Sequence, residues 1–133
     1  MKHLFTYGTL MCEDIMLKVS GHHLEREPGI LKGYSRRSVK KQYYPAIIPE
    51  KESFVDGIIY RNIPDSTWNL LDRFEGEMYE RHKVTITLAN RVLLPAETYV
   101  VRPLYEQCLD KTEWDFENFV KNNKANFYVQ ELE

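Results

Sequence analysis

The order of strand-like and helical segments constrains the fold of this chain more than any other feature. About five runs have the alternating or β-branched pattern of strands, and about three have apolar residues at helical spacing. The two kinds do not alternate regularly, which argues against a parallel α/β sheet. The order predicts an α+β fold, a small mixed β-barrel or strongly curved sheet flanked by about three helices.

The expected strands are bounded by glycine, proline or polar residues. A further extended segment, Tyr44–Pro49, has a proline near each end, so we expect it at the rim or edge of a barrel. Gly57 is expected to allow a close approach of two backbones, and residues 21–29 are expected to form a polar connection. The expected strands are Lys2–Tyr7, Ile30–Lys41 (bent at Gly33), Phe54–Arg61, and a hairpin of Tyr79–Leu88 with Arg91–Val101.

The expected helices are marked by their capping residues. The first covers Met11–Ser20 and is followed by a glycine that stops it. The second is capped by Asp65 or Ser66 and ends at Gly76. The third starts with Thr112 as its N-cap and leads into a tail, residues 126–133, that holds only a short apolar patch. The C-terminal helix and tail together cover residues 112–133.

Size and charge limit the classes of protein. A chain of 133 residues fits one domain, so we expect a single domain over residues 1–133. A formal net charge of −2 gives no general reason to expect nucleic acid or an anionic membrane as a partner. No run approaches the roughly 20 apolar residues of a membrane span, and no export signal is recognisable. Cys12 and Cys108 fit no redox or metal spacing, which predicts unpaired thiols in the cytoplasm.

The segment Tyr7–Leu10 joins the first expected strand to the first expected helix. The first N–H groups of a helix lack partners and attract negative charge. Gly8 allows the backbone to approach a ligand, and Thr9 can cap the helix or add a hydroxyl donor. Such N–H groups can hold a carboxylate or an oxyanion, for which one donor contributes about 3–4 kcal/mol. Taken alone, the same sequence is also a common structural junction.

Glu75 stands in the last turn of the second expected helix. The negative end of the helix and partial burial beside Phe74 both raise the pKa of its carboxyl group. Arg73 and Arg81 would oppose that shift if they faced it. A raised pKa suits a general base that works near neutral pH. A glutamate at such a position is, however, more often a solvated surface residue.

Other chemistry has weaker signals. No His, Cys or Glu spacing of a metal site occurs, and neither a phosphate-binding glycine loop nor a nucleophilic serine motif is present. A basic cluster, Arg36, Arg37, Lys40 and Lys41, could touch RNA or an acidic ligand. Charge on an exposed or edge strand is the commoner explanation of such a cluster. We therefore expect no metal and no nucleic-acid partner.

Six short motifs occur in an order that is more specific than any one of them. They are Phe5–Met11, Gly33-Tyr34, Tyr44–Ile47, Val55–Tyr60, Leu71–Gly76 and Tyr79-x-Arg81. Together they resemble the gamma-glutamylcyclotransferase-like family, in particular its branch similar to gamma-glutamylamine cyclotransferase and the plant avirulence-induced proteins. The resemblance covers residues 3–101 approximately, and the chain beyond about residue 105 matches no motif.

The resemblance implies a β-barrel with a cavity between the Tyr7–Leu10 loop and a catalytic glutamate at the position of Glu75. It implies a cofactor-free acyl transfer in which a γ-glutamyl amine or peptide is cyclised to 5-oxoproline and the amine is released. The implied substrate-binding residues are Tyr7, Gly8, Thr9, Leu10, Tyr44, Pro45 and Ala46. The basic cluster would then favour an acidic leaving group. The alternative is a non-catalytic module that binds a small carboxylate or a protein on the same fold.

Overall fold

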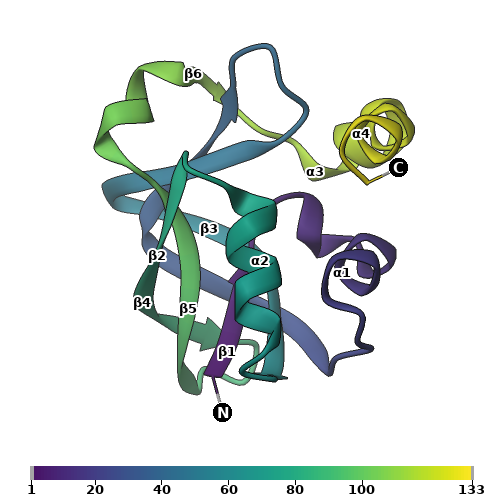
Figure 1. Ribbon diagram of the computed structural model, residues 1–133. Helices are drawn as coiled ribbons and strands as arrows, with labels where there is room; N and C mark the ends of the chain where they lie inside the picture. The colour runs from purple at the N-terminus through teal and green to yellow at the C-terminus, as the bar shows by residue number, and fades with distance from the viewer. Residues whose placement is uncertain (1, 133) are drawn as a thin grey trace.

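The strands close into a barrel in the computed structural model, which describes residues 2–132 (Figure 1). The order around the barrel is β3-β1-β5-β4-β2, and β3 also pairs with β2. Only the β1–β5 pair in this ring is parallel, so the sheet is mixed. The strands are β1 (Lys2–Thr6), β2 (Arg26–Val39), β3 (Pro45–Ile63), β4 (Tyr79–Leu88) and β5 (Leu93–Val101). This architecture confirms the predicted α+β barrel.

Two strands are longer than the sequence predicted. β2 starts at Arg26, because Pro28 and Gly29 pair with β3 and do not form a connection. β3 unites the two expected segments into one strand of 19 residues, with an irregularity opposite Gly33. Its first part, Pro45–Pro49, pairs with β2 and, within the described chain, with no second strand. That position agrees with the expected place at the barrel rim.

Gly57 lies where β3 crosses closest to β1. A Cβ atom at this position would collide with the carbonyl oxygen of Thr6 and would lie 2.7 Å from Cζ of Phe5. Only a residue without a side chain allows the two backbones to come so near. The expected close approach is therefore confirmed, and it fixes the strand that carries the Tyr7–Leu10 turn.

The first two helices follow the sequence closely. A 3-10 turn, η1 (Thr9–Met11), precedes α1 (Glu13–Ser20), and Gly21 ends that helix in the left-handed conformation with φ of 77°. α2 (Thr67–Glu75) ends at Gly76 as predicted. Ser66 occupies its N-cap position, but the serine side chain makes no capping hydrogen bond. The 3-10 turn delays the start of α1 by two residues.

The C-terminal region differs most from expectation. Thr112 lies in an unpredicted strand, β6 (Leu109–Glu113), which follows the 3-10 segment η2 (Pro103–Cys108) and pairs with β2. The helix cap is Asp115, whose carboxylate accepts hydrogen bonds from two backbone N–H groups. The expected tail is helical as far as Leu132, and residue 133 lies outside the described residues. α3 (Phe116–Asn118), the π-helical turn η3 (Phe119–Asn123) and α4 (Lys124–Leu132) follow without a break.

The apolar residues form two clusters. One fills the barrel, and the other lies between the barrel and the helices. Strand alternation explains the division, since Phe5 belongs to the inner cluster and its neighbour Leu4 to the outer one. α1 and α4 lie side by side on one flank of the barrel (Figure 1), joined by an ion pair of 2.9 Å between Lys124 and Asp14. α4 is thereby held over the end of β1.

Both cysteines, Cys12 and Cys108, are free thiols. Within residues 2–132, no helix has the length and apolar character that crossing a membrane requires.

Candidate active site

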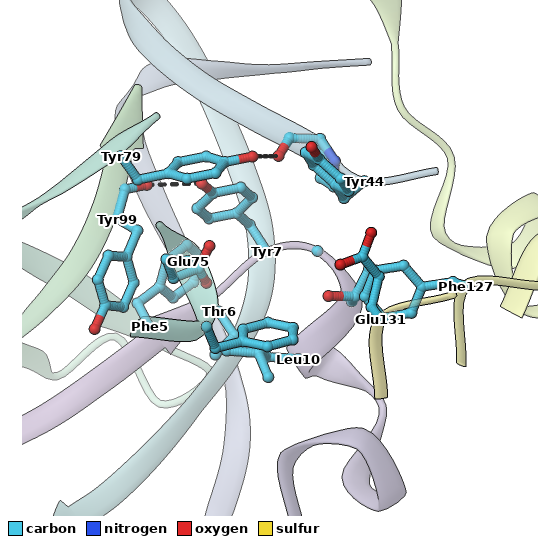
Figure 2. A pocket seen from close by; sticks show the side chains of 14 residues that line it. Phe5, Thr6, Tyr7, Leu10, Tyr44, Glu75, Tyr79, Tyr99, Phe127 and Glu131 are labelled. Carbon is cyan, nitrogen blue, oxygen red and sulfur yellow. Dashed lines mark hydrogen bonds between the residues drawn. The ribbon is translucent and has the colours of Figure 1, made fainter. Parts of the chain in front are cut away.

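A cavity of about 210 Å³ lies where the turn after β1, the end of α2 and the face of α4 meet (Figure 2). The structure brings six of the seven predicted binding residues and Glu75 to its wall. Ala46 is the exception, because its side chain is fully buried in the outer core. The lining residues are Phe5, Thr6, Tyr7, Gly8, Thr9, Leu10, Tyr44, Pro45, Phe74, Glu75, Tyr79, Tyr99, Phe127 and Glu131.

The turn from Tyr7 to Cys12 has a hydrogen-bond donor for every one of its carbonyl groups. The donors are Arg36 Nη1 to Tyr7 (2.9 Å), Met11 N to Gly8 (3.0 Å), Cys12 N to Thr9 (3.1 Å), Tyr60 Oη to Leu10 (2.7 Å), Arg26 Nη2 to Met11 (2.9 Å) and Met16 N to Cys12 (3.0 Å). The N–H groups that open the 3-10 turn have no acceptor within it. With its acceptors occupied, this turn offers mainly donors to the cavity.

Gly8 is required for a packing reason that the sequence did not predict. Its φ of −133° is extended backbone that any residue adopts. A Cβ atom, however, would lie 2.8 Å from both Cγ and Cδ of Pro45. The missing side chain therefore accommodates β3. Thr9 does not cap α1 either, since Cys12 occupies that N-cap position and no side-chain capping bond forms.

Glu75 projects into the cavity from the end of α2 (Figure 2). Burial, with a smaller contribution from the charge of Asp72, raises the pKa of its carboxyl group to about 8. Arg81 Nε lies 2.8 Å from Asp72 Oδ1, so this arginine neutralises the aspartate. Arg73 is exposed. The predicted direction of the shift holds, and burial is its main cause.

The tyrosines around Glu75 are fixed by hydrogen bonds. Tyr7 Oη donates to the carbonyl of Tyr99 and Tyr79 Oη to that of Pro45, each at 2.7 Å (Figure 2). Tyr99 Oη donates to Asp72 Oδ1 at 2.7 Å. Burial raises the pKa of all three phenols. They form rigid polar walls, whereas Glu75 can exchange a proton near neutral pH.

The sequence did not single out several lining residues. Tyr79 and Tyr99 come from the β4–β5 hairpin, where alternation along each strand could have placed them on the outer face. Phe127 and Glu131 are four residues apart on α4 and therefore share a face. That spacing was the available signal. Glu131 supplies a second carboxylate, on the opposite side of the cavity from Glu75 (Figure 2).

The basic cluster is not at the cavity. Arg36 is buried, and Arg37 pairs with Glu50 at 3.0 Å. Lys40 and Lys41 are exposed, and none of the four residues lines the site. The expectation that they favour an acidic leaving group is therefore wrong. Residues 2–132 also contain no cluster of three or more His, Cys, Asp or Glu that could hold a metal ion.

Comparison with known proteins agrees with this architecture. The family model described as gamma-glutamyl cyclotransferase, AIG2-like, matches residues 4–117. The chain belongs to that family. AIG2-like protein D of Arabidopsis thaliana is 33% identical over 129 residues, which make up 96% of this chain and 84% of that protein.

Solved structures share the fold of this AIG2-like chain. The solution structure of an Arabidopsis thaliana protein aligns with a TM-score of 0.76 at 25% identity, over 97% of this chain and 87% of that one. A gamma-glutamyl cyclotransferase structure aligns with a TM-score of 0.68 at 12% identity, over 99% and 88% of the two chains. The family match includes the turn and Glu75 but ends at residue 117, before Phe127 and Glu131.

Proposed function

We propose that this AIG2-like protein catalyses intramolecular acyl transfer on a γ-glutamyl amine or peptide, forming 5-oxoproline and releasing the amine. One observation carries the proposal. A carboxyl group with a pKa of about 8 shares a cavity with a turn whose carbonyl groups are all engaged elsewhere. The family match supports the same chemistry, since its model describes gamma-glutamyl cyclotransferases.

The proposed reaction needs only one substrate molecule and one acid/base group. Glu75 accepts a proton from the α-ammonium group of the substrate. The freed amine attacks the γ-carbonyl carbon, forming a C–N bond and a tetrahedral oxyanion. Collapse of this intermediate breaks the bond to the leaving nitrogen, which receives the proton from Glu75. The ring nitrogen then gives up its second proton through Glu75 to the released amine, which departs as an ammonium ion. Because the nucleophile and electrophile belong to one molecule, orientation and electrostatic stabilisation supply most of the catalysis.

The residues that line the cavity support the other proposed roles. Backbone N–H groups of Gly8, Thr9 and Leu10 hold the oxyanion or the substrate α-carboxylate. No Lys, Arg or His side chain lines the cavity among the described residues, so anionic groups of the substrate depend on backbone donors. Tyr7 and Tyr79 form the wall beside Glu75 (Figure 2), and Tyr44 with Pro45 forms the rim.

The test is the release of 5-oxoproline from a panel of γ-glutamyl amines and peptides. Glu75→Gln keeps the shape of the side chain and removes the base, so the rate on any accepted substrate should fall about 100- to 10,000-fold. Glu77→Gln is the matched control, because Glu77 is exposed and does not line the cavity. It should act as wild type.

Three results would contradict the proposal. Equal activity of wild type and Glu75→Gln would remove Glu75 from the mechanism. Equal losses in Glu75→Gln and Glu77→Gln would show a general charge effect. A folded wild-type protein that releases 5-oxoproline from no member of the panel would favour a non-catalytic module that binds a small carboxylate or a protein partner.

A further inference from the structure

Arg36 lies directly behind the turn that the proposed function uses. It comes from β2, and only 8% of its side-chain surface is exposed. The guanidinium does not line the cavity. Its Nη1 instead donates a hydrogen bond of 2.9 Å to the carbonyl oxygen of Tyr7. A positive charge therefore contacts a peptide group whose other side faces the cavity.

Three contacts from other parts of the chain hold this guanidinium. Nη2 donates to Asp56 Oδ1 at 3.1 Å, and Nη1 also reaches the carbonyl oxygen of Asp56 at 3.2 Å. The guanidinium carbon lies 5.6 Å from the centre of the Trp114 ring. The planar group is thus fixed from β3 and from the segment after β6, which suits the rigid geometry of arginine. These contacts hold the Arg36 guanidinium in the position from which it binds the carbonyl of Tyr7.

The geometry of a peptide group connects Arg36 to the cavity. In a trans peptide, C=O and N–H point in opposite directions. The described residues contain no cis peptide, so the Tyr7–Gly8 bond is trans. Arg36 does not line the cavity and holds the Tyr7 carbonyl, so we expect the Gly8 N–H, on the opposite edge of the peptide, to point toward the cavity that Gly8 lines. A charged donor on the carbonyl also polarises the peptide and makes its N–H a stronger donor.

We infer that Arg36 is a positioning residue that orients the Tyr7–Gly8 peptide and strengthens the Gly8 N–H as the donor to the reaction oxyanion. This inference rests on the proposed function. The oxyanion exists only in the tetrahedral intermediate, so Arg36 acts on kcat and leaves substrate binding nearly unchanged.

Arg36→Met tests the inference, because methionine keeps much of the volume and removes the charge. We expect kcat to fall about 10- to 100-fold with KM within about twofold of wild type. Arg36→Lys keeps the charge without the fork of donors, so its kcat should fall only about three- to fivefold. Arg37→Met is the control, because this neighbour pairs with Glu50 and does not reach the turn. It should leave kcat unchanged.

A second readout needs no catalysis. In ¹H–¹⁵N spectra without substrate, Arg36→Met should shift the Gly8 amide proton upfield, Arg36→Lys should shift it less in the same direction, and Arg37→Met should leave it in place. The inference fails if folded Arg36→Met keeps the kcat of wild type or the Gly8 resonance of wild type, or if its loss is entirely in KM. If Arg36→Met does not fold, an unchanged Gly8 resonance in Arg36→Lys would equally overturn it.

The two readouts separate this inference from the proposed function. Full activity in Arg36→Met would reject the role of Arg36 and leave the proposed reaction intact. An inactive wild type whose Gly8 resonance still responds to Arg36→Met would reject the proposed reaction and keep the effect of Arg36 on the peptide.

Discussion

The two sides of the cavity are built in different ways. On one side, the turn after β1 and the end of α2 are anchored to the barrel by buried or part-buried hydrogen bonds from Arg36, Tyr60 and Tyr99. On the other side, α4 contributes Phe127 and Glu131. Phe127 packs edge-on against Phe74 with ring centres 6.4 Å apart, while the charged end of α4 is exposed.

We interpret this difference as a division of roles, in which the barrel side carries out the proposed reaction and α4 influences which substrates are preferred. The side that holds the proposed base and donors is fixed by contacts from several strands, so the loss of one contact leaves others in place. The α4 side is held by the Lys124–Asp14 ion pair and by the contacts of Phe127 with Phe74 and Phe119, and it lies outside the region matched by the family model. We therefore expect changes on the barrel side to affect kcat strongly, and changes on α4 to adjust which substrates are preferred.

The largest expected effect is the pH dependence set by Glu75. The proposed base would act in its ionised form, and burial raises its pKa to about 8. The acidic limb of kcat/KM should therefore approach a tenfold fall per pH unit well below pH 8, which gives about a 50-fold fall between pH 8 and pH 6. A titration of the labelled Glu75 carboxyl by ¹³C NMR should give the same pKa. An acidic limb near pH 4.5 would contradict the role of burial.

The same shift predicts a dependence of stability on pH. Between the unfolded pKa near 4.5 and the folded pKa near 8, the folded state binds the proton and the unfolded state does not. Glu75 therefore lowers the free energy of unfolding as pH rises through this window. Glu75→Gln should exceed wild type in stability at pH 9, by roughly 1–3 kcal/mol after allowance for the part of the group that faces the cavity. The two proteins should converge near pH 5, and Glu77→Gln should follow wild type throughout.

A smaller effect is expected from Gly8→Ala on the barrel side. The added methyl group would lie 2.8 Å from the ring of Pro45, so the turn or β3 must move. We expect a loss of about 1–3 kcal/mol in the free energy of unfolding and at least a tenfold fall in kcat. Pro45→Ala removes the obstructing ring atoms. The double variant should regain part of both losses, and a strictly additive double variant would show that Pro45 is not the cause.

The smallest effect is expected from Glu131→Gln on α4. An exposed charge contributes about 0.2–1 kcal/mol, which corresponds to less than about a sixfold change in KM. KM should rise for substrates whose leaving amine carries a second positive charge and fall for those with an acidic leaving group. Glu117→Gln, a change at an exposed acid elsewhere in the C-terminal helical segment, is the control. A change in kcat with no change in preference would contradict the proposed division between the two sides.

The sequence predicted those parts of the fold and site that depend on local signals. Alternation identified the β4–β5 hairpin, and Gly76 marked the end of α2 and hence the place of Glu75. The C-terminal helix was placed too early because Thr112 and Asp115 are both acceptable caps, and only the pairing of β6 with β2 decides between them. The pattern of residues within one segment does not reveal which distant segment it will pair with.

Side-chain partners explain the other differences. Arg36 stands among charged residues and was expected on an exposed strand, but its partners Tyr7 and Asp56 are distant in sequence. Ala46 was expected at the cavity because it adjoins Tyr44 and Pro45. As the next residue along a strand, however, it points into the core. Long-range packing decided both positions.

The hydrogen bond from Tyr7 to the carbonyl of Tyr99 spans 92 positions of the chain. The proposed donors and the proposed base therefore meet only after β5 has taken its place between β1 and β4. A partly folded chain, even one with a complete β2–β3 hairpin, would not bring the proposed donors and the proposed base to their places across the cavity. Recovery of turnover during refolding would then report closure of the barrel, and an early rise of helical signal would precede any catalysis.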